Sequence, residues 1–270
     1  MNFADKLYAS LKSVAKVCFQ SRVLHGRGKC SGRIVVMGNG PSLSASMPQC
    51  LELMRTSAGM SVNFAAVAPE FKALRPEYYV LADPHFFKDI DDGNLATLRR
   101  NIKAVDWKME LFVPAPMQKK AMMLYGSENV EIRAFNAVGV EGFQWLEHTF
   151  YKWGLGMPRP RNVLIPAIMI ALGEGFREVL VFGADHSWMS TLSVTDRNEV
   201  VSVQPHFYKD GEEEEARVRH EYRGYRLDQI VESFAIAFRA YHRIEAFARK
   251  CGARVVNATP GSFIDAFERL

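Results

Sequence analysis

Polar side chains that can bind small molecules recur in this sequence directly after short apolar runs. Asn39 follows the run Ile34–Met37, and Asn63 lies near the end of the run Met60–Ala65. The same arrangement recurs at Asp83, Asp185 and Asn257. Amide and carboxylate groups can bind ribose hydroxyls or a metal ion. Because the ends of parallel strands share one edge of a sheet, we expect these side chains to converge there.

The segment IVVMGNGPSL at 34–43 is the most informative stretch. Its glycines allow a tight turn after a buried strand, and its Pro-Ser pair is typical of the start of a helix or a short turn. Backbone N–H groups at such a turn predict a site for a nucleotide or phosphate; the alternative is a plain strand-to-helix turn. Leu43 stands where the dinucleotide fingerprint has its third glycine, and no P-loop Gly-Lys-Ser/Thr follows. The candidate binding residues here are Gly38, Asn39, Gly40, Pro41 and Ser42.

Residues 186–225 form a long stretch with little regular pattern, directly after a predicted strand. Such an insertion favours an active-site lid. Histidine is the usual general base near neutral pH, and the candidates here are His186, His206 and His220. Aromatic residues could close over a sugar or base, or anchor the lid on the core: Trp188, Tyr208, Tyr222 and Tyr225. Glu212–Glu215 is interpreted as a solvated acidic run, with a metal role as the weaker alternative.

Arg159 and Arg161 precede a predicted helix, and Arg161 is a candidate partner for a phosphate. An exposed basic turn is the alternative. We predict no resident metal, because the four cysteines are scattered without CxxC spacing. The same scatter favours reduced thiols in the cytoplasm.

Composition bounds the class of protein. The chain has 270 residues, 48% of them hydrophobic, which is enough for a large core. A net charge of +4 is too small to indicate a nucleic-acid partner. No apolar run is long enough for a membrane span, and charges break any secretory signal, so we expect a cytoplasmic protein.

Residues 1–32 are predicted to form a basic amphipathic helix. Phe3, Leu7, Leu11, Val14 and Cys18 recur at helical spacing among lysines. Such a helix can lie on an anionic membrane surface, which would place the protein at the inner membrane. It can equally cover its own domain or a partner subunit in a homo-oligomer.

Short apolar runs alternate with helical patterns over residues 33–270. Candidate strands are Ile34–Met37, Met60–Ala65, Tyr78–Ala82, Leu111–Val113, Val130–Ala134, Val179–Phe182 and Arg254–Asn257. Candidate helices are Phe86–Ile102, Met117–Leu124, Phe143–Tyr151, Val163–Leu172 and Leu227–Cys251. This alternation predicts one α/β domain with a single Rossmann-like, mostly parallel sheet flanked by helices. The Gly/Pro/Arg stretch at 154–161 is interpreted as a connection inside that domain.

Taken in order, these motifs resemble the bacterial lipooligosaccharide sialyltransferase family, which transfers a nonulosonic acid from its CMP-activated form. The matching stretches are GNGPSL at 38–43, VNFA around Asn63, LADPHFF at 81–87 and ALGEGFREVLVFGAD at 171–185. The resemblance implies that Asn63, Asp83 and Asp185 contact the donor nucleotide. Tyr225 stands where that family has its proposed general-base histidine, with Arg223 two residues before it.

NATPGSFIDAF at 257–267 is similar to the end of a related group, the motility accessory factors and 6-hydroxymethylpterin pyrophosphokinase-like proteins. Three hypotheses follow. The first is a metal-independent, inverting glycosyltransferase with a CMP-sugar donor, no essential cofactor and a glycan or glycolipid acceptor. The second is a pyrophosphokinase that needs Mg²⁺ and ATP and acts on a pterin-like substrate. The third is a non-catalytic nucleotide-binding or scaffolding protein.

Overall fold

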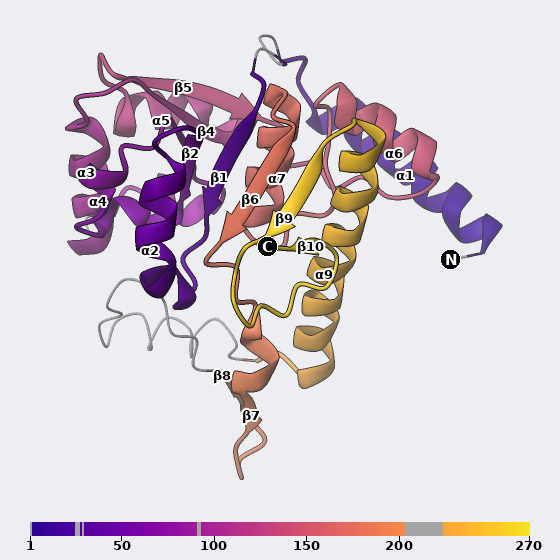
Figure 1. The fold of residues 1–270 in the computed structure, drawn as a ribbon. Helices are drawn as coiled ribbons and strands as arrows, with labels where there is room; N and C mark the ends of the chain where they lie inside the picture. The colour runs from indigo at the N-terminus through magenta and orange to yellow at the C-terminus, as the bar shows by residue number, and fades with distance from the viewer. Residues whose placement is uncertain (1, 25–27, 29, 91–92, 203–223) are drawn as a thin grey trace.

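The computed structural model describes residues 2–24, 28, 30–90, 93–202 and 224–270. Its centre is an eight-stranded sheet with the strand order β10-β9-β6-β1-β2-β3-β4-β5, in which all paired strands run parallel (Figure 1). The strands are β1 (Arg33–Met37), β2 (Ala58–Val62), β3 (Tyr78–Val80), β4 (Met109–Pro114), β5 (Val130–Phe135), β6 (Glu178–Phe182), β9 (Arg254–Asn257) and β10 (Glu268–Arg269). The helices are α1 (Phe3–Gln20), α2 (Ser42–Leu53), α3 (Phe71–Leu74), α4 (Gly93–Lys103), α5 (Gln118–Tyr125), α6 (Gln144–Lys152), α7 (Leu164–Glu174) and α9 (Leu227–Lys250).

Apolar side chains on both sides of each central strand explain the layered arrangement. Ile34 and Val36 of β1 pack into the core that contains α7 and α9, whereas Val35 and Met37 pack against α2. Toward the β4–β5 edge, α4 and α5 cover a further buried cluster. A strand buried on both faces needs a continuous apolar run, which explains the apolar sequences of the central strands β1 and β6. The prediction of a mostly parallel sheet flanked by helices is confirmed.

The strand order reverses at β1. The chain builds β2 to β5 on one side of β1 and then returns to place β6 and β9 on the other side (Figure 1). In open α/β sheets, ligands bind beyond the carboxyl ends of the strands at such a switch point. The turns that follow β1 and β6 are therefore the expected borders of a binding crevice.

Several predicted boundaries differ from the structure. The strand expected at Met60–Ala65 ends at Val62, because Asn63 adopts a left-handed φ of 50° and starts a 3-10 turn. The helix expected from Phe86 begins at Gly93, because Phe86 belongs to a separate 3-10 turn, Pro84–Phe87. The stretch expected to be an irregular lid contains a 3-10 turn, Ser187–Thr191, and the hairpin β7 (Leu192–Val194) and β8 (Val200–Ser202).

Part of the predicted lid lies outside the described residues. This applies to the candidate bases His206 and His220, and also to Tyr208, Glu212–Glu215, Tyr222 and Arg223.

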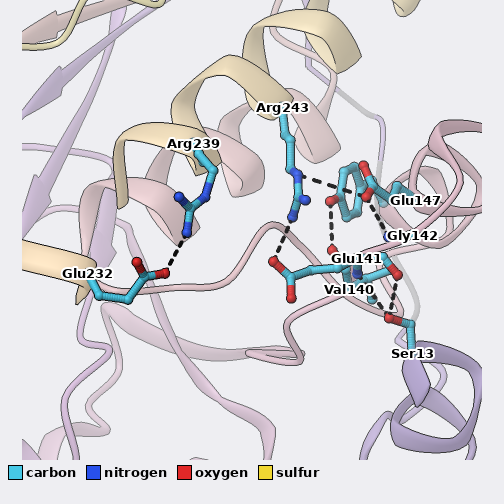
Figure 2. Close-up of polar contacts among 9 residues, drawn as sticks. Ser13, Val140, Glu141, Gly142, Glu147, Glu232, Arg239 and Arg243 are labelled. Atoms are coloured by element: carbon cyan, nitrogen blue, oxygen red, sulfur yellow. Dashed lines mark hydrogen bonds and ion pairs between the residues drawn. The ribbon is translucent and has the colours of Figure 1, made fainter. Parts of the chain in front are cut away.

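A helix is present in the predicted stretch 1–32, but α1 is shorter, Phe3–Gln20, and it packs on the domain through small residues. Ser10, Ser13 and Val17 are its buried positions. Ser13 Oγ donates to the carbonyl oxygen of Glu141 at 2.7 Å and accepts from its N–H at 2.9 Å (Figure 2). The apolar positions singled out in the sequence, from Phe3 to Cys18, are exposed instead.

The loop that receives α1 is held by a charged cluster. Arg243 of α9 donates to Glu141 at 2.9 Å and lies 3.9 Å from the carboxylate of Glu147, which accepts from the N–H of Gly142 (Figure 2). Burial raises the pKa of Glu147, and Arg243 opposes that shift. This arginine therefore provides the positive charge that favours the ionised form of a buried carboxylate near α1.

We predict that Arg243→Met lowers the free energy of unfolding by about 3 kcal/mol at about pH 8, because it leaves two carboxylates without their cation. The loss should shrink at about pH 5, since the raised pKa of Glu147 lets it become neutral in the folded state. Urea denaturation at both pH values measures this. Arg239→Met is the matched control, because Arg239 makes an exposed pair with Glu232 that contributes about 0.5 kcal/mol (Figure 2). An equal loss at both pH values would contradict the assignment.

Candidate functional site

A cavity of about 900 Å³ lies beyond the carboxyl ends of β1, β2, β3 and β6. Most of the candidate site residues line it, although they come from distant parts of the sequence. They are Asn39, Gly40, Pro41, Asn63, Asp83, Arg161, Asp185, His186 and Tyr225. Gly38 and Ser42 lie behind this lining and hold it in place. Four of the five strand-end residues that were expected to converge therefore line one cavity, and Asn257 does not.

The turns after β1 and β6 touch each other, and glycine makes this contact possible. A Cβ atom on Gly38 would lie 2.4 Å from the carbonyl oxygen of Gly183, and one on Gly40 would lie 1.9 Å from Asp185 Oδ2. Gly183 itself has a left-handed φ of 62°. The glycines of the GNG segment are thus required for close approach of two strand ends.

The backbone N–H groups of the GNG turn are used inside the protein. Gly38 N donates to Phe182 O at 2.8 Å, Gly40 N donates to Gly183 O at 2.9 Å, and Ser42 N donates to Asp185 Oδ1 at 3.2 Å. These three N–H groups are therefore engaged within the protein, and their contact with a phosphate stays a prediction. The same turn geometry serves to join β1 to β6.

Asp185 caps a helix that belongs to another part of the sequence. Its carboxylate accepts from Ser42 N and, at 2.8 Å, from Ser42 Oγ. Within the described residues, Pro41 at the start of α2 makes no side-chain capping bond, so Asp185 fills that role. A negative charge at this helix end also interacts favourably with the helix dipole. Contact of Asp185 with a ligand stays a prediction.

Asn39 and Asn63 each have a buried side-chain oxygen without a hydrogen-bond donor among the described residues. Asn39 Nδ2 donates to Val62 O at 3.2 Å, which ties the β1 turn to β2. The hydroxyl of Tyr79 donates to Asn63 O at 2.6 Å, and this bond supports the unusual backbone of Asn63. Among the described residues, the buried Oδ1 atoms of both asparagines have no hydrogen-bond partner. A buried acceptor without a donor costs about 1–3 kcal/mol, so both atoms favour a ligand that donates hydrogen bonds.

Asp83 lies at the rim of the cavity. Its carboxylate accepts from the N–H of His85 at 2.7 Å and caps the 3-10 turn that follows β3. The side chain is exposed, so its remaining lone pairs face solvent.

His186 lies deep in the wall of the cavity, in a left-handed conformation with a φ of 52°. Its Nε2 is 2.5 Å from the hydroxyl of Tyr241 and 3.4 Å from Asn162 Nδ2, and its ring stacks on Trp188 at 4.1 Å. Burial lowers the pKa of His186 to about 3. The imidazole is therefore neutral at physiological pH and a weak proton acceptor, although its role as a general base stays a prediction.

The wall formed by α9 and the segment before α7 contains polar residues that the sequence interpretation did not include. They are Asn162, Gln229 and Ser233. Asn162 Oδ1 accepts from Leu164 N at 3.0 Å and from the Tyr241 hydroxyl at 3.0 Å. Gln229 and Ser233 are four residues apart beside apolar positions of one helix, a spacing that could have revealed them. Tyr225, at the lip, is 57% exposed.

Asn257 was expected at the shared edge, but it does not line the cavity and is buried behind the edge together with Thr259. Thr259 Oγ1 accepts from Ala184 N at 3.0 Å, and Asn257 Nδ2 donates to Ser262 Oγ at 3.0 Å. Ser262 Oγ in turn donates to Ala184 O at 2.6 Å. These buried residues fix the backbone just before Asp185. Within the described part of the chain, no group of three or more His, Cys, Asp or Glu residues could hold a metal ion.

Comparison with known proteins gives a structural match only. No protein-family model and no curated protein matches the sequence. The fold is similar to that of the MAf glycosyltransferase from Magnetospirillum magneticum AMB-1, with a TM-score of 0.52 and 12% sequence identity. The match covers 100% of this chain and 38% of that chain, so this chain spans well under half of its length. At this identity, the similarity establishes a shared fold.

We predict that Gly40→Ala lowers the free energy of unfolding by about 2 kcal/mol, because the added methyl group forces the turn away from Asp185 and Gly183. Urea denaturation measures this loss. Gly93→Ala is the control, because a Cβ atom there would have no described neighbour within 4 Å. Equal stability of the two variants would show that the β1 and β6 turns do not need this close contact.

We predict that His186 contributes to acid sensitivity. The unfolded chain binds a proton below its usual pKa of 6.5, whereas folded His186 stays neutral until about pH 3. Between pH 6.5 and about pH 3, the free energy of unfolding therefore falls by about 1.4 kcal/mol for each pH unit of acidification because of this residue.

His186→Gln should flatten the dependence of the free energy of unfolding on pH between about pH 6 and about pH 4. Urea denaturation across that range measures the slope. His242→Gln, which changes an exposed histidine paired with Asp265, is the matched control. An unchanged slope in His186→Gln would show that the imidazole accepts a proton in the folded protein.

Proposed function

We propose that the protein is a glycosyltransferase that uses a nucleotide-activated sugar. The donor is a CMP-linked sugar, a nonulosonic acid by the sequence resemblance, and the acceptor is a hydroxyl of a glycan or glycolipid. The observation that carries this proposal concerns Asn39 and Asn63, which line a cavity at the switch point of a parallel sheet. Their buried Oδ1 atoms have no hydrogen-bond partner among the described residues.

The chemistry of the two amides favours the nucleoside part of such a donor. Their free acceptors need N–H or O–H donors, which the amino group of a cytosine and the hydroxyls of a ribose provide. A phosphate has acceptors only, so it would not satisfy these oxygens. On another part of the cavity wall, the exposed cation of Arg161 suits the phosphate. A volume of about 900 Å³ accommodates a nucleotide and a sugar together.

The fold gives independent support. A solved structure with the same fold is that of a glycosyltransferase, and the motif order resembles the sialyltransferase family. Neither comparison specifies the sugar, the acceptor or the need for a metal. These parts of the proposal depend on the site chemistry and on the tests below.

The proposed transfer is a displacement at the anomeric carbon of the donor. The acceptor oxygen forms a bond to that carbon while its proton passes to a base, and the carbon–oxygen bond to CMP breaks with its electron pair. Attack opposite to the leaving group inverts the anomeric configuration. Positioning of both substrates in the cavity supplies much of the rate. Tyr225, His206 and His220 stay the candidate bases, since neutral, buried His186 is a weak one.

The carboxylates that a pyrophosphokinase would need for Mg²⁺ are engaged in other bonds. Both oxygens of Asp185 accept from Ser42, and Asp83 Oδ1 accepts from His85 N. Mg²⁺ prefers octahedral oxygen ligands. Both oxygens of Asp185 are already bonded to Ser42, so Asp83 alone of the two keeps solvent-facing lone pairs for the ion. The arrangement therefore favours the glycosyltransferase over the Mg²⁺-dependent alternative.

We predict that CMP and CTP bind without Mg²⁺ and that Asn39→Ala weakens CMP binding at least tenfold, because one buried hydrogen bond contributes about 1–3 kcal/mol. Isothermal titration calorimetry with CMP, CTP, ATP and GDP, each with and without Mg²⁺, measures this. Asn94→Ala is the matched control, since Asn94 is exposed on α4 and should leave affinity unchanged.

Two results would overturn the proposal. Binding of Mg²⁺–ATP in the absence of CMP binding would favour the pyrophosphokinase. Failure of every nucleotide to bind would favour a non-catalytic protein. If CMP binds and Asn39→Ala binds it equally well, the nucleotide lies elsewhere in the molecule.

A further inference from the structure

Helix α1 carries a broad apolar stripe on the side that faces away from the domain. Leu11 is 63% exposed, Tyr8 is 68% exposed and Phe19 is 90% exposed. At 100° per residue, these positions and their neighbours form one sector of the helix surface. The exposed apolar residues of the sector are Phe3, Ala4, Leu7, Tyr8, Leu11, Val14, Ala15, Cys18 and Phe19. Apolar side chains gathered in this way indicate an interaction surface.

The stripe stays exposed because α1 is fastened through a different side. Ser10 Oγ accepts from Phe143 N at 3.0 Å, and Ser13 Oγ bonds to the backbone of Glu141 (Figure 2). Ser21 Oγ, just after the helix, donates to Leu155 O. The helix is thus attached along its length next to α6, at the side of the molecule (Figure 1). These bonds hold the stripe in a fixed outward orientation.

The charged residues beside the stripe indicate which kind of surface it binds. Lys12 and Lys16 are on the polar side of α1, whereas Asp5 is its one acidic residue. Two exposed tryptophans, Trp145 on α6 and Trp153 at its end, belong to the neighbouring segment. Apolar residues, lysines and tryptophan together are typical of surfaces that lie in the interface of an anionic bilayer. A second copy of α1 would bring lysines against lysines with little acidic charge to balance them.

We propose that α1 lies flat on an anionic lipid bilayer, with its apolar stripe among the acyl chains and its lysines at the headgroups. No helix within the described ranges is long and apolar enough to cross a membrane, which is consistent with a surface position for α1. This inference does not depend on the proposed nucleotide, because it concerns another face of the protein.

Co-sedimentation with vesicles tests the proposal. Full-length protein should bind vesicles of phosphatidylglycerol and phosphatidylcholine, and should bind pure phosphatidylcholine about tenfold more weakly. The double variant Leu11→Glu/Phe19→Glu should lose at least about tenfold in affinity for the mixed vesicles, because it places charges in the inserted stripe. Lys12→Glu/Lys16→Glu should lose affinity for the mixed vesicles and retain that for phosphatidylcholine.

Met123→Glu is the matched control, because Met123 is 75% exposed on α5 and should not affect binding. Thermal melting should be the same for all variants, since Leu11 and Phe19 lie away from the bonds that attach α1. Absence of vesicle binding would overturn the proposal, as would equal binding by Leu11→Glu/Phe19→Glu. A third result would also overturn it: light scattering shows that the wild-type protein is a dimer and does not bind vesicles, and that Leu11→Glu/Phe19→Glu is a monomer.

Discussion

The contact between the turns after β1 and β6 is the constraint on which the rest of the site depends. Gly38 and Gly40 lack side chains, so the backbone of one turn can bond directly to the backbone of the other. This contact brings Asp185 to the start of α2 and aligns the two strands at the switch point. The carboxyl ends of parallel strands always lie at one edge of the sheet. The hydrogen bonds between these two turns additionally fix the shape of that edge.

The same contact divides the polar residues of the edge into two groups. Asp185, Asn257 and Thr259 bond to the protein and make the frame. Asn39 and Asn63 bond to the frame through one group each and keep a second group unpartnered among the described residues. Groups held in this way are positioned before any ligand arrives, which would lower the entropic cost of binding one.

Sequence alone was enough for the layer architecture and for the convergence of four of the five strand-end residues. Apolar runs predicted buried strands, and their alternation with helices predicted a parallel sheet. Sequence could not say which polar group would face a ligand, because that depends on partners far along the chain. The backbone N–H groups of Gly38 and Gly40 are used by β6, and Asp185 serves α2. Asn162 was overlooked because its bonds to the Tyr241 hydroxyl and to His186 form only in the folded protein.

For helix α1, the sequence predicted the helix but not the side by which it packs on the domain. Its periodicity correctly predicted a helix with an apolar stripe, yet periodicity does not say which side of a helix the domain covers. Here two serines and a valine make the attachment, and the stripe is left outside. Ser10 and Ser13 bond to backbone groups in a loop, a type of contact without an apolar repeat in the sequence.

Helix α9 connects the attached helix to the cavity. Near its carboxyl end, Arg243 holds the loop that receives α1. Toward its amino end, Gln229, Ser233 and Phe234 line the cavity. One continuous helix of 24 residues therefore fixes the distance and angle between the apolar stripe of α1 and the cavity. If α1 lies on a bilayer, the mouth of the cavity has a fixed orientation relative to the membrane surface. An acceptor carried on a lipid would then lose little translational and rotational entropy when it enters the cavity.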